Sequence, residues 1–423
     1  MRVLWITNTL FEEYYTSKGL PGVFTGGWMR SLALKLKELD PTIELAIASR
    51  DRSANGLEEV QAGGFVFYAL PGVVYQDGYD ASIEKYWKEV AERFKPEIVH
   101  IHGSEFPHGL AYVKNVGKNR CVVSLQGIIS RIARYYAGGI SPKVFSRHRT
   151  FYDTFVASTP AREQKKYECQ GRLEEELLQT VSHIIGRTSW DKDHAWAINP
   201  KAEYHFCNET LRAPFYNTEK WTIGKCKRHR IFLSQAAKPI KGIHRLIEAM
   251  PLILREYPDT EVFVAGVDFL SRSTLRDKLR RTTYASYIGA LIDKYGLQDK
   301  IHFTGMINAE KMAEQYRMAN VFVCPSAIEN SPNSLGEAQL MGCPVVASYV
   351  GGVPDMVEHG VTGLMYRFEE TEMLASAVCR IFGDDKLSSS LSRNEIAAAS
   401  VRHDGEVNAR RMLDIYKKIA VEE

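Results

Sequence analysis

The chain lacks any apolar run near the roughly 20 residues that a membrane-spanning helix needs, so we do not expect an integral membrane protein. It also lacks a C-x-x-C pair, and its seven cysteines are scattered. An odd, dispersed set predicts free thiols in a reducing compartment rather than a disulfide framework or a zinc site. Neither sign of charge dominates, because 54 Lys and Arg face 51 Asp and Glu. This balance gives no indication of nucleic acid as a partner.

Targeting segments and low-complexity sequence are also missing. The first apolar run follows Arg2 and soon meets Glu12 and Glu13, and no small-residue cleavage site follows it. We therefore expect no signal peptide and a cytoplasmic protein, with peripheral attachment to the inner face of a membrane left open. The 423 residues, 45% of them hydrophobic, leave room for two sizeable cores.

Short apolar strands alternate with helical patterns along the first half of the chain. Strand-like runs occur at 3–7, 44–49, 65–70, 97–102, 121–126 and 183–188. Helical spacing of apolar residues appears between them, for example over 28–39 and 81–94. This alternation predicts a parallel sheet with helices on both faces, here a domain over 1–215.

The same alternation repeats after a polar stretch near 211–229. Strands are expected at 231–236, 261–266, 301–305, 321–326, 344–348 and 362–366, and a long basic helical region at 270–295. We interpret this half as a second α/β domain over 225–400. Helix-rich residues 370–423 could cover this domain, or their last part, about 405–423, could return to the first one. In open α/β sheets ligands bind beyond the carboxyl ends of the strands.

The most informative stretch runs from 321 to 363. Its first strand leads to a loop with Glu329, and Ser331-Pro332 has the pattern of an N-cap followed by proline at the first helical position. The backbone N–H groups of Asn333, Ser334 and Leu335 would then begin a helix, a place that binds phosphate. Glu337, one turn further, could accept hydrogen bonds from sugar hydroxyls. The alternative is a capped amphipathic helix with two solvated glutamates.

The whole pattern favours the ligand site. Glu329 and Glu337 have an E-x7-E spacing, the run 351–355 (GGVPD) and the pair Gly360 and Gly363 follow, and Lys241-Gly242 opens an earlier helix. The chain therefore resembles the retaining GT-B glycosyltransferases of the E-x7-E type, in glycosyltransferase group 1 and similar to family 4. The resemblance is strong over about 230–370. It is looser over 1–215, where it depends on Gly26-Gly27 and the run 97–102 (EIVHIH).

The resemblance implies two Rossmann-like, doubly wound domains that face each other across a cleft, and a nucleoside-diphosphate sugar as donor, UDP above all. It places three residues at the reaction centre: Glu329 at the sugar hydroxyls, Lys241 at the pyrophosphate and His102 at the sugar–acceptor junction. It assigns donor binding to Gly27, Lys238, Met306, Asn333, Ser334, Leu335 and Glu337. It implies neither a cofactor nor a metal.

Residue chemistry bears on two of these assignments. A lysine at a helix start opposes the helix dipole by a few tenths to about 1 kcal/mol, and a bound anion would reverse that sign. The alternative for Lys241 is a solvated surface lysine. His100 and His102 are two apart on a strand and share a face. A metal pair is conceivable there, with Glu105 and His108 near in sequence, but no third ligand is set by spacing, and a packed His100 beside a functional His102 is favoured.

Two positions depart from the family pattern. Ala236 stands where an arginine commonly shares the phosphate charge, and Gln126 stands where a histidine is common. Either Lys238 replaces the missing arginine or the pyrophosphate is held with one cation fewer. The departures put the subfamily chemistry in question and leave the fold unaffected.

Residues 114–172 carry twelve Lys and Arg against three Asp and Glu, interleaved with aromatic residues. Such a stretch could contact an anionic membrane or a lipid-diphosphate acceptor. The alternative is a solvated helix face whose aromatic side chains lie in the core. No nucleic-acid motif accompanies the basic residues, so we expect no nucleic-acid partner.

The expected function is transfer of a hexose or N-acetylhexosamine from a nucleoside-diphosphate sugar to a hydroxyl of a glycan or lipid-linked saccharide, in surface polysaccharide synthesis. Two alternatives remain: a nucleotide-sugar epimerase of the same fold, and a catalytically silent scaffold in a glycan-synthesis complex.

Overall fold

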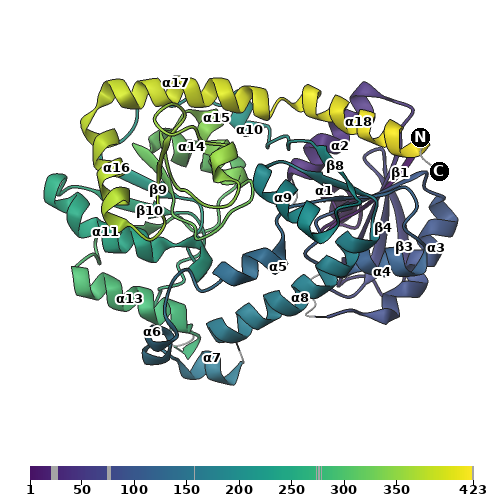
Figure 1. The fold of residues 1–423 in the computed structure, drawn as a ribbon, viewed down its shortest axis with the longest axis horizontal. Coiled ribbons are helices and arrows are strands. Elements are labelled where there is room, and N and C mark those ends of the chain that lie inside the picture. The colour runs from purple at the N-terminus through teal and green to yellow at the C-terminus, as the bar shows by residue number, and fades with distance from the viewer. Residues whose placement is uncertain are drawn as a thin grey trace. The chain divides into compact units, whose positions relative to one another are not determined.

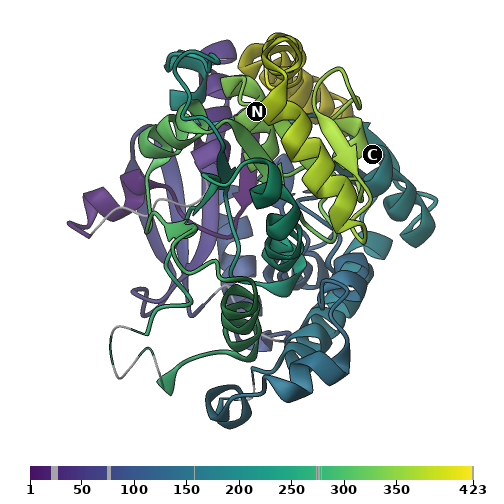
Figure 2. The same cartoon turned by 90° about the vertical axis from the view of Figure 1, so that its left-hand side faces the viewer.

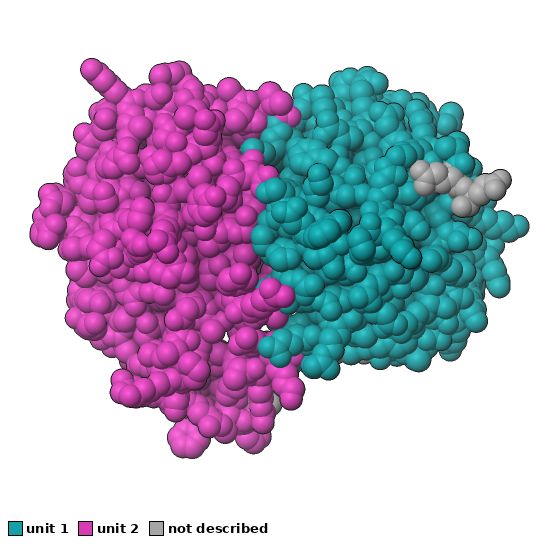
Figure 3. All heavy atoms as spheres, in the orientation of Figure 1, with its two compact units in different colours: residues 1–131, 166–212, 402–423 teal, residues 132–165, 213–401 magenta. Residues whose placement is uncertain are grey.

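The computed structural model describes residues 1–20, 27–73, 78–156, 158–272, 274, 277 and 279–421. The chain forms two compact units, coloured separately in Figure 3. The first consists of residues 1–131, 166–212 and 402–423, and the second of residues 132–165 and 213–401. These units differ from the domain bounds expected from the sequence, 1–215 and 225–400, chiefly because 132–165 groups with the second unit.

The first unit is built on one sheet with the strand order β3-β4-β2-β1-β5-β6-β7-β8. Its strands are β1 (Arg2–Ile6), β2 (Glu44–Asp51), β3 (Glu58–Ala62), β4 (Phe65–Pro71), β5 (Ile98–His102), β6 (Cys121–Ser124), β7 (His183–Gly186) and β8 (Glu203–Phe206). β3 pairs antiparallel with β4, and the other pairings are parallel. β3 and β8 were not predicted from the sequence. Both are edge strands with many polar side chains, so neither carries the continuous apolar run that marks a buried parallel strand.

The helices of the first unit cover both faces of this sheet (Figure 1). They are α1 (Glu12–Ser17), α2 (Gly27–Leu39), α3 (Glu84–Phe94), α4 (His108–Asn115), α9 (Ser189–Ile198), α18 (Gly405–Val421) and most of α5 (Ile129–Ile132) and α8 (Pro160–Thr180), with the 3₁₀ turn η1 (Ala81–Ile83). α18 packs against α2, and its Tyr416 hydroxyl accepts a hydrogen bond from Trp5 Nε1 at 2.9 Å. The last helix of the chain therefore completes the core of the first unit.

The second unit has a fully parallel sheet with the strand order β11-β10-β9-β12-β13-β14. Its strands are β9 (Arg230–Leu233), β10 (Glu261–Val264), β11 (Ile301–Phe303), β12 (Val321–Cys324), β13 (Val345–Ser348) and β14 (Leu364–Tyr366). Strand order reverses between β9 and β12, as it does between β1 and β5 in the first unit. Doubly wound sheets bind their ligands at such a reversal.

Helices surround the sheet of the second unit, and Figure 2 shows α11 beside α16 on one face. They are α6 (Pro142–Arg147), α7 (Phe151–Phe155), α10 (Pro214–Asn217), α11 (Ile243–Glu256), α13 (Thr283–Tyr295), α14 (Ala309–Met318), α15 (Asn333–Met341), α16 (Thr371–Gly383) and α17 (Asp385–Arg402), with the 3₁₀ turns η2 (Ala133–Tyr135), η3 (Pro239–Lys241) and η4 (Val353–Asp355). Within the helical region expected over 270–295, α13 begins at Thr283, where the Thr282 hydroxyl caps it by accepting from Ala285 N, and residues 273, 275, 276 and 278 lie outside the described residues.

Each of the two units is an α/β unit whose sheet is parallel apart from the β3–β4 pair of the first unit. This confirms the architecture predicted from the alternation of strands and helices. None of the helices in the described part of the chain combines the length and apolar character that a membrane crossing requires.

Candidate active site

In the second unit the side chains of Lys241 and Glu329 meet. Lys241 ends η3, which follows β9, and Glu329 lies in the loop after β12. β9 and β12 are adjacent and parallel, so both loops leave the same edge of the sheet at the strand-order reversal. Lys241 Nζ lies 2.7 Å from Glu329 Oε1, and the Ser326 hydroxyl donates to the same oxygen at 2.7 Å. Lys241 lies just before α11, where a cation opposes the helix dipole. The carboxylate of Glu329 is the anion that offsets this unfavourable placement.

Two glycines allow these loops to approach so closely. Gly242 has φ +72°, and a Cβ atom on it would lie 1.7 Å from the carbonyl oxygen of Pro325. Gly351 has φ +51°, and its Cβ would lie 2.0 Å from the carbonyl oxygen of Glu329. Any larger residue would clash with backbone and would also be strained in the left-handed region. The glycines noted in the motif thus position the loop that carries Glu329.

A cavity of about 490 Å³ opens beside this pair. Lys238 and Lys241 line it, and so does Met306, whose side chain is 81% exposed. The remaining lining residues come from the ends of β9, β10 and β11 and the segments after them: Ser234, Gln235, Ala236, Ala237, Val264, Ala265, Gly266, Val267, Phe269, Phe303, Ile307 and Met312. The structure therefore brings three of the expected site residues into one cavity that carries two cationic side chains.

The start of α15 differs from the sequence-based expectation. The N-cap is Pro332 and no side chain caps the helix, so Ser331 is not the N-cap; its hydroxyl contacts Met356 Sδ at 3.5 Å. The helix begins at Asn333, and the N–H of Leu335 donates to Pro332 O at 2.9 Å. The expectation that Leu335 offers an unused N–H is therefore wrong. Asn333 and Ser334 occupy the first two helical positions, whose backbone N–H groups have no hydrogen-bond partner within the helix.

Glu337 is 4% exposed and lies one turn into α15. The Tyr316 hydroxyl lies 3.0 Å from Ser334 O and 3.3 Å from Glu337 Oε2. The Tyr316 hydroxyl hydrogen-bonds this buried carboxylate and so fixes its orientation. The alternative of a solvated glutamate is excluded by this burial.

In the first unit His102 ends β5 with a buried imidazole ring. The ring stacks on His100, with centroids 3.7 Å apart, and lies 4.2 Å from the ring of Trp5. Among the residues that the structure describes, neither ring nitrogen of His102 has a hydrogen-bond partner. Burial, and then the neighbouring His100, lower the pKa of His102 well below its usual value, so the ring is neutral. His102 lines a small cavity, and the buried ion pair of Arg187 and Glu209 lines the same cavity.

His100 has a packing role. Its Nδ1 lies 2.6 Å from the Tyr416 hydroxyl, and its Nε2 lies 2.6 Å from the Ser124 hydroxyl. Burial lowers its pKa to about 3. Because both nitrogens are hydrogen-bonded, His100 has none left for a metal beside His102.

Gly27, the other donor residue expected in this unit, is the first residue of α2, which follows β1. A Cβ atom on it would lie 3.3 Å from side-chain carbons of Arg212. Gly26, the other half of the pair, lies outside the described residues. Gly27 thus lies in the segment after β1, and His102 lies at the end of β5. The strand order of this sheet reverses between these two strands.

Two buried carboxylates lie near the carboxyl end of β5: Glu105, which the sequence suggested only as a conceivable metal ligand, and Glu174, which was not predicted. Glu105 accepts from Asn8 Nδ2 at 2.7 Å, and burial raises its pKa. Glu174 accepts from the Ser104 hydroxyl at 2.7 Å and from Ser130 N at 3.0 Å, and burial raises its pKa to about 7. These partners are up to 97 residues apart in sequence, so no local pattern signals them.

Gln126, which departs from the family pattern, joins the neighbouring ion pair. Its side-chain amide donates to Glu209 Oε1 at 2.8 Å. Glu209 in turn pairs with Arg187 at 2.5 Å. The amide therefore has a defined partner that holds the carboxylate in place.

A second histidine group lies at the amino ends of β7 and β8. In the described part of the chain, His183, Glu203 and His205 place one potential ligand atom each within 4.8 Å of one another. Glu203 also forms an ion pair with Lys418, and His183 Nδ1 lies 3.1 Å from His205 Nε2. The lysine supplies the positive charge at this carboxylate, and the group lies at the edge of the sheet opposite His102.

Part of the second unit matches a known protein family. Residues 217–397 match the family model "Glycosyl transferases group 1". Spore coat protein SA of Bacillus subtilis is 27% identical over 258 residues, which cover 57% of this chain and 64% of that protein. The matched segments span about half the length of the first curated relatives, between 43% and 64%.

Solved structures match over nearly the whole chain. Sucrose-phosphate synthase from Thermosynechococcus elongatus has a TM-score of 0.71 at 17% identity, covering 99% of this chain and 98% of that one. HepE from Anabaena, in complex with UDP and glucose, has a TM-score of 0.63 at 15% identity and covers 99% of both chains. Residues 217–397 of this chain are thus similar to the glycosyl transferases group 1 family, and the chain has the GT-B fold of these solved structures.

Proposed function

We propose that this chain is a retaining glycosyltransferase that transfers a hexose or N-acetylhexosamine from a nucleoside-diphosphate sugar, with UDP as the nucleotide. The acceptor in this proposal is a hydroxyl of a glycan or lipid-linked saccharide, the product contributes to a surface polysaccharide, and the reaction takes place on the cytoplasmic side. The observation that carries the proposal is the Lys241–Glu329 pair beside a cavity that Lys238 and Met306 also line.

The chemistry asked of this site is stabilisation of a leaving group. As the bond between the anomeric carbon and the β-phosphate oxygen breaks, negative charge grows on the pyrophosphate. Lys238 and Lys241, which both line the cavity, would stabilise that charge, and electrostatic stabilisation of this kind typically contributes more to catalysis than any other single effect. Glu329, held by Ser326, would accept hydrogen bonds from the donor sugar and fix its orientation.

Retention in this proposal needs no enzyme nucleophile. The acceptor hydroxyl attacks the face from which the phosphate leaves, the new bond forms between its oxygen and the anomeric carbon, and its proton passes to the departing phosphate oxygen. The neutral imidazole of His102, whose two nitrogens have no partner among the described residues, can bond a sugar hydroxyl without adding charge. Glu337 would bond the ribose hydroxyls.

The match of residues 217–397 to the family model and the UDP bound in HepE support a nucleotide-sugar donor. The test is a thermal-shift panel of UDP-, GDP- and ADP-sugars, because a ligand at about 100 times its Kd adds ~2.7 kcal/mol of stability. The donor that stabilises is then incubated with candidate acceptors, and the anomeric configuration of the product is read by NMR, with Lys241→Ala as the inactive control.

Each alternative predicts a different result. A product of inverted configuration would overturn the retaining assignment. Epimerised sugar formed from donor alone would indicate the epimerase. Donor binding that is never followed by loss of the sugar, with any acceptor, would indicate the silent scaffold.

A further inference from the structure

Helix α7 presents two phenylalanines to solvent. Phe151 is 95% exposed and Phe155 is 92% exposed. Four residues apart on a helix, they lie on one face. Asp153 between them points inward, is buried, and accepts a hydrogen bond from the backbone N–H of Thr283. The contacts of α7 therefore hold both aromatic rings outward.

The surface around these rings is positively charged. Within 141–165 the exposed cationic side chains are Lys143, Arg147, Arg149, Arg162 and Lys165. The two acidic residues of this range are Asp153, which is buried, and Glu163, which is half-buried. We call the exposed side chains of α6, α7 and the first turns of α8, residues 141–165 as described, the α6–α7 surface.

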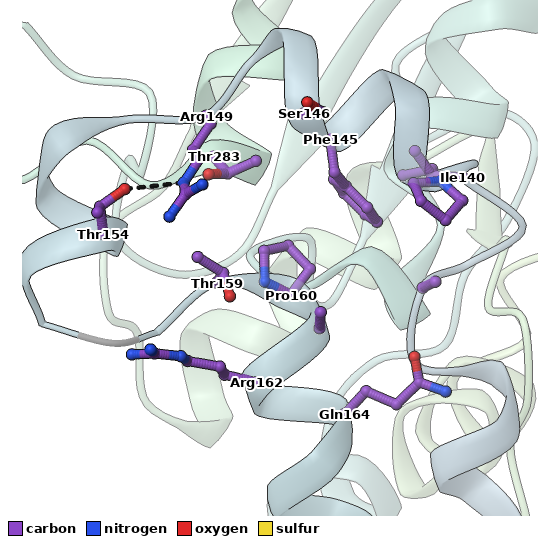
Figure 4. Close-up of a pocket in the computed structure, with 13 residues that line it drawn as sticks. Ile140, Phe145, Ser146, Arg149, Thr154, Thr159, Pro160, Arg162, Gln164 and Thr283 are labelled. Carbon is purple, nitrogen blue, oxygen red and sulfur yellow. Dashed lines mark hydrogen bonds between the residues drawn. The ribbon is translucent and has the colours of Figure 1, made fainter.

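A pocket of about 340 Å³ opens in the second unit beside the α6–α7 surface (Figure 4). Arg149 and Arg162 line it together with apolar side chains such as Ile140, Phe145 and Pro160. Arg149 Nε donates to Thr154 Oγ1 at 2.9 Å, which fixes its guanidinium at this site. Cationic groups beside an apolar recess match the two parts of a phospholipid, an anionic phosphate and hydrocarbon.

We propose that the α6–α7 surface docks onto an anionic lipid bilayer. Phe151 and Phe155 enter the boundary between head groups and acyl chains, and the surrounding lysines and arginines contact lipid phosphates. Each such cation near an anionic membrane raises partitioning about fivefold, and the effect weakens with salt. Exposed aromatic residues beside basic residues are the composition of interfacial helices.

Charge complementarity favours a bilayer over a second copy of this chain. A symmetric dimer through this surface would place its cations opposite the same cations, which costs free energy. An anionic bilayer instead offers negative charge to every one of them.

The segment that carries the surface is bound to the donor-side loop of the same unit. His244 Nε2 lies 2.9 Å from Gly138 O, and a Cβ atom on Gly138 would lie 2.3 Å from the carbonyl oxygen of Pro239, which separates Lys238 from Ile240. Docking at the α6–α7 surface would thus hold the candidate donor site near the bilayer. The inference itself does not depend on the proposed function.

The test is flotation of the full chain with phosphatidylcholine vesicles that contain or lack phosphatidylglycerol, at low and high salt. We expect binding only to the anionic vesicles and less of it at high salt. The double variant Phe151→Ser/Phe155→Ser should bind at least tenfold less, whereas Trp196→Ser, which removes an aromatic ring that is 68% exposed in the first unit, should bind as the unchanged protein does. Lys143→Glu/Arg147→Glu should also bind less, and Lys85→Glu/Lys88→Glu on α3 should not.

Thermal unfolding and the oligomeric state by light scattering are measured on every variant. Absence of binding to anionic vesicles at low salt would overturn the proposal. So would equal binding by the phenylalanine variant and its tryptophan control. A dimer that dissociates in the phenylalanine variant, without vesicle binding, would show that the surface joins two copies instead. None of these outcomes bears on donor binding in the thermal-shift panel, so the two proposals fail separately.

Discussion

The ammonium nitrogen of Lys241 lies 2.7 Å from a carboxylate oxygen of Glu329, across two loops that are 88 residues apart in sequence. Without a donor, each charge is the partner of the other. A bound pyrophosphate would compete with Glu329 for Lys241, and the displaced carboxylate oxygen would be available to a sugar hydroxyl. In the proposed function, binding of the donor and orientation of its sugar would therefore be linked through this pair.

The first prediction concerns that competition. Glu329→Gln keeps the size of the side chain and removes the charge that holds Lys241, so UDP should bind as tightly or more tightly. Turnover should fall by about 100-fold, because the sugar loses an orienting carboxylate. Calorimetry with UDP and steady-state kinetics check both parts, with the exposed Glu358→Gln as control. Loss of UDP affinity in Glu329→Gln would show that the carboxylate belongs to the nucleotide site.

Glu337 should behave in the opposite way. If it bonds the ribose, Glu337→Ala weakens UDP and UDP-sugar alike by roughly 1–3 kcal/mol, the value of one lost charged hydrogen bond. Tyr316→Phe is the matched control, since it removes the neighbouring hydroxyl and keeps the carboxylate. A lower melting temperature with unchanged UDP affinity would assign Glu337 to the packing of α15 alone.

The position of Ala236 on the cavity wall leads to a third prediction. Lys238→Ala and Lys241→Ala should each lower kcat/KM by about 100-fold, the ~2.7 kcal/mol typical of one lost charge stabiliser. Ala236→Arg should partly rescue Lys238→Ala, because the new guanidinium would start from the wall of the same cavity. Lys311→Ala, an exposed change on α14, is the control. Unchanged kinetics in Lys238→Ala would show that Lys241 stabilises the leaving group without help from Lys238.

Glu174 should make stability depend on pH. Its pKa in the native state is about 7, above the ordinary value of 4.5, so the native chain keeps a proton that the unfolded chain has lost. The free energy of unfolding should therefore fall as pH rises through this window, by up to about 3 kcal/mol. Glu174→Gln resembles the protonated carboxyl and should remove most of that fall. Urea unfolding below and above the window, on both proteins, measures it; equal pH slopes would contradict the prediction.

Gly242 offers a test of the loop geometry. Gly242→Ala should destabilise the chain by more than the roughly 1–2 kcal/mol of a left-handed alanine, because its Cβ would also meet Pro325 O at 1.7 Å. Gly296→Ala is the control, since Gly296 has φ +65° with nothing within 4 Å of its Cβ. Chemical denaturation gives the loss of stability in both variants. The difference between them separates the cost of the left-handed backbone from the cost of the clash with Pro325. Thermal shifts with UDP should be smaller for Gly242→Ala alone, because the change displaces Lys241.

Several features of the site could be predicted because they are local in sequence. Alternating strands and helices predicted two parallel sheets, since periodicity over a few residues reports which faces are buried. The glycines after Lys241 and after β13 marked tight loops, because only glycine adopts φ > 0 without cost. The N-cap of α15 was predicted at Ser331 and lies at Pro332, because the residue that caps a helix depends on how the preceding loop is held. Here Ser331 contacts Met356, and Glu329 O accepts a hydrogen bond from Gly352 N.

The amino-acid sequence alone determined the α/β architecture and the short list of candidate residues, Glu329, Lys241, His102 and Glu337 among them. The tertiary structure decided what each residue contacts. His100 and His102 have the same chemistry and sit two positions apart, yet His100 is hydrogen-bonded to Tyr416, 316 residues away, whereas His102 has both nitrogens without a partner among the described residues. Contacts between distant segments have no local pattern to reveal them, because they arise only when strands far apart in sequence lie side by side.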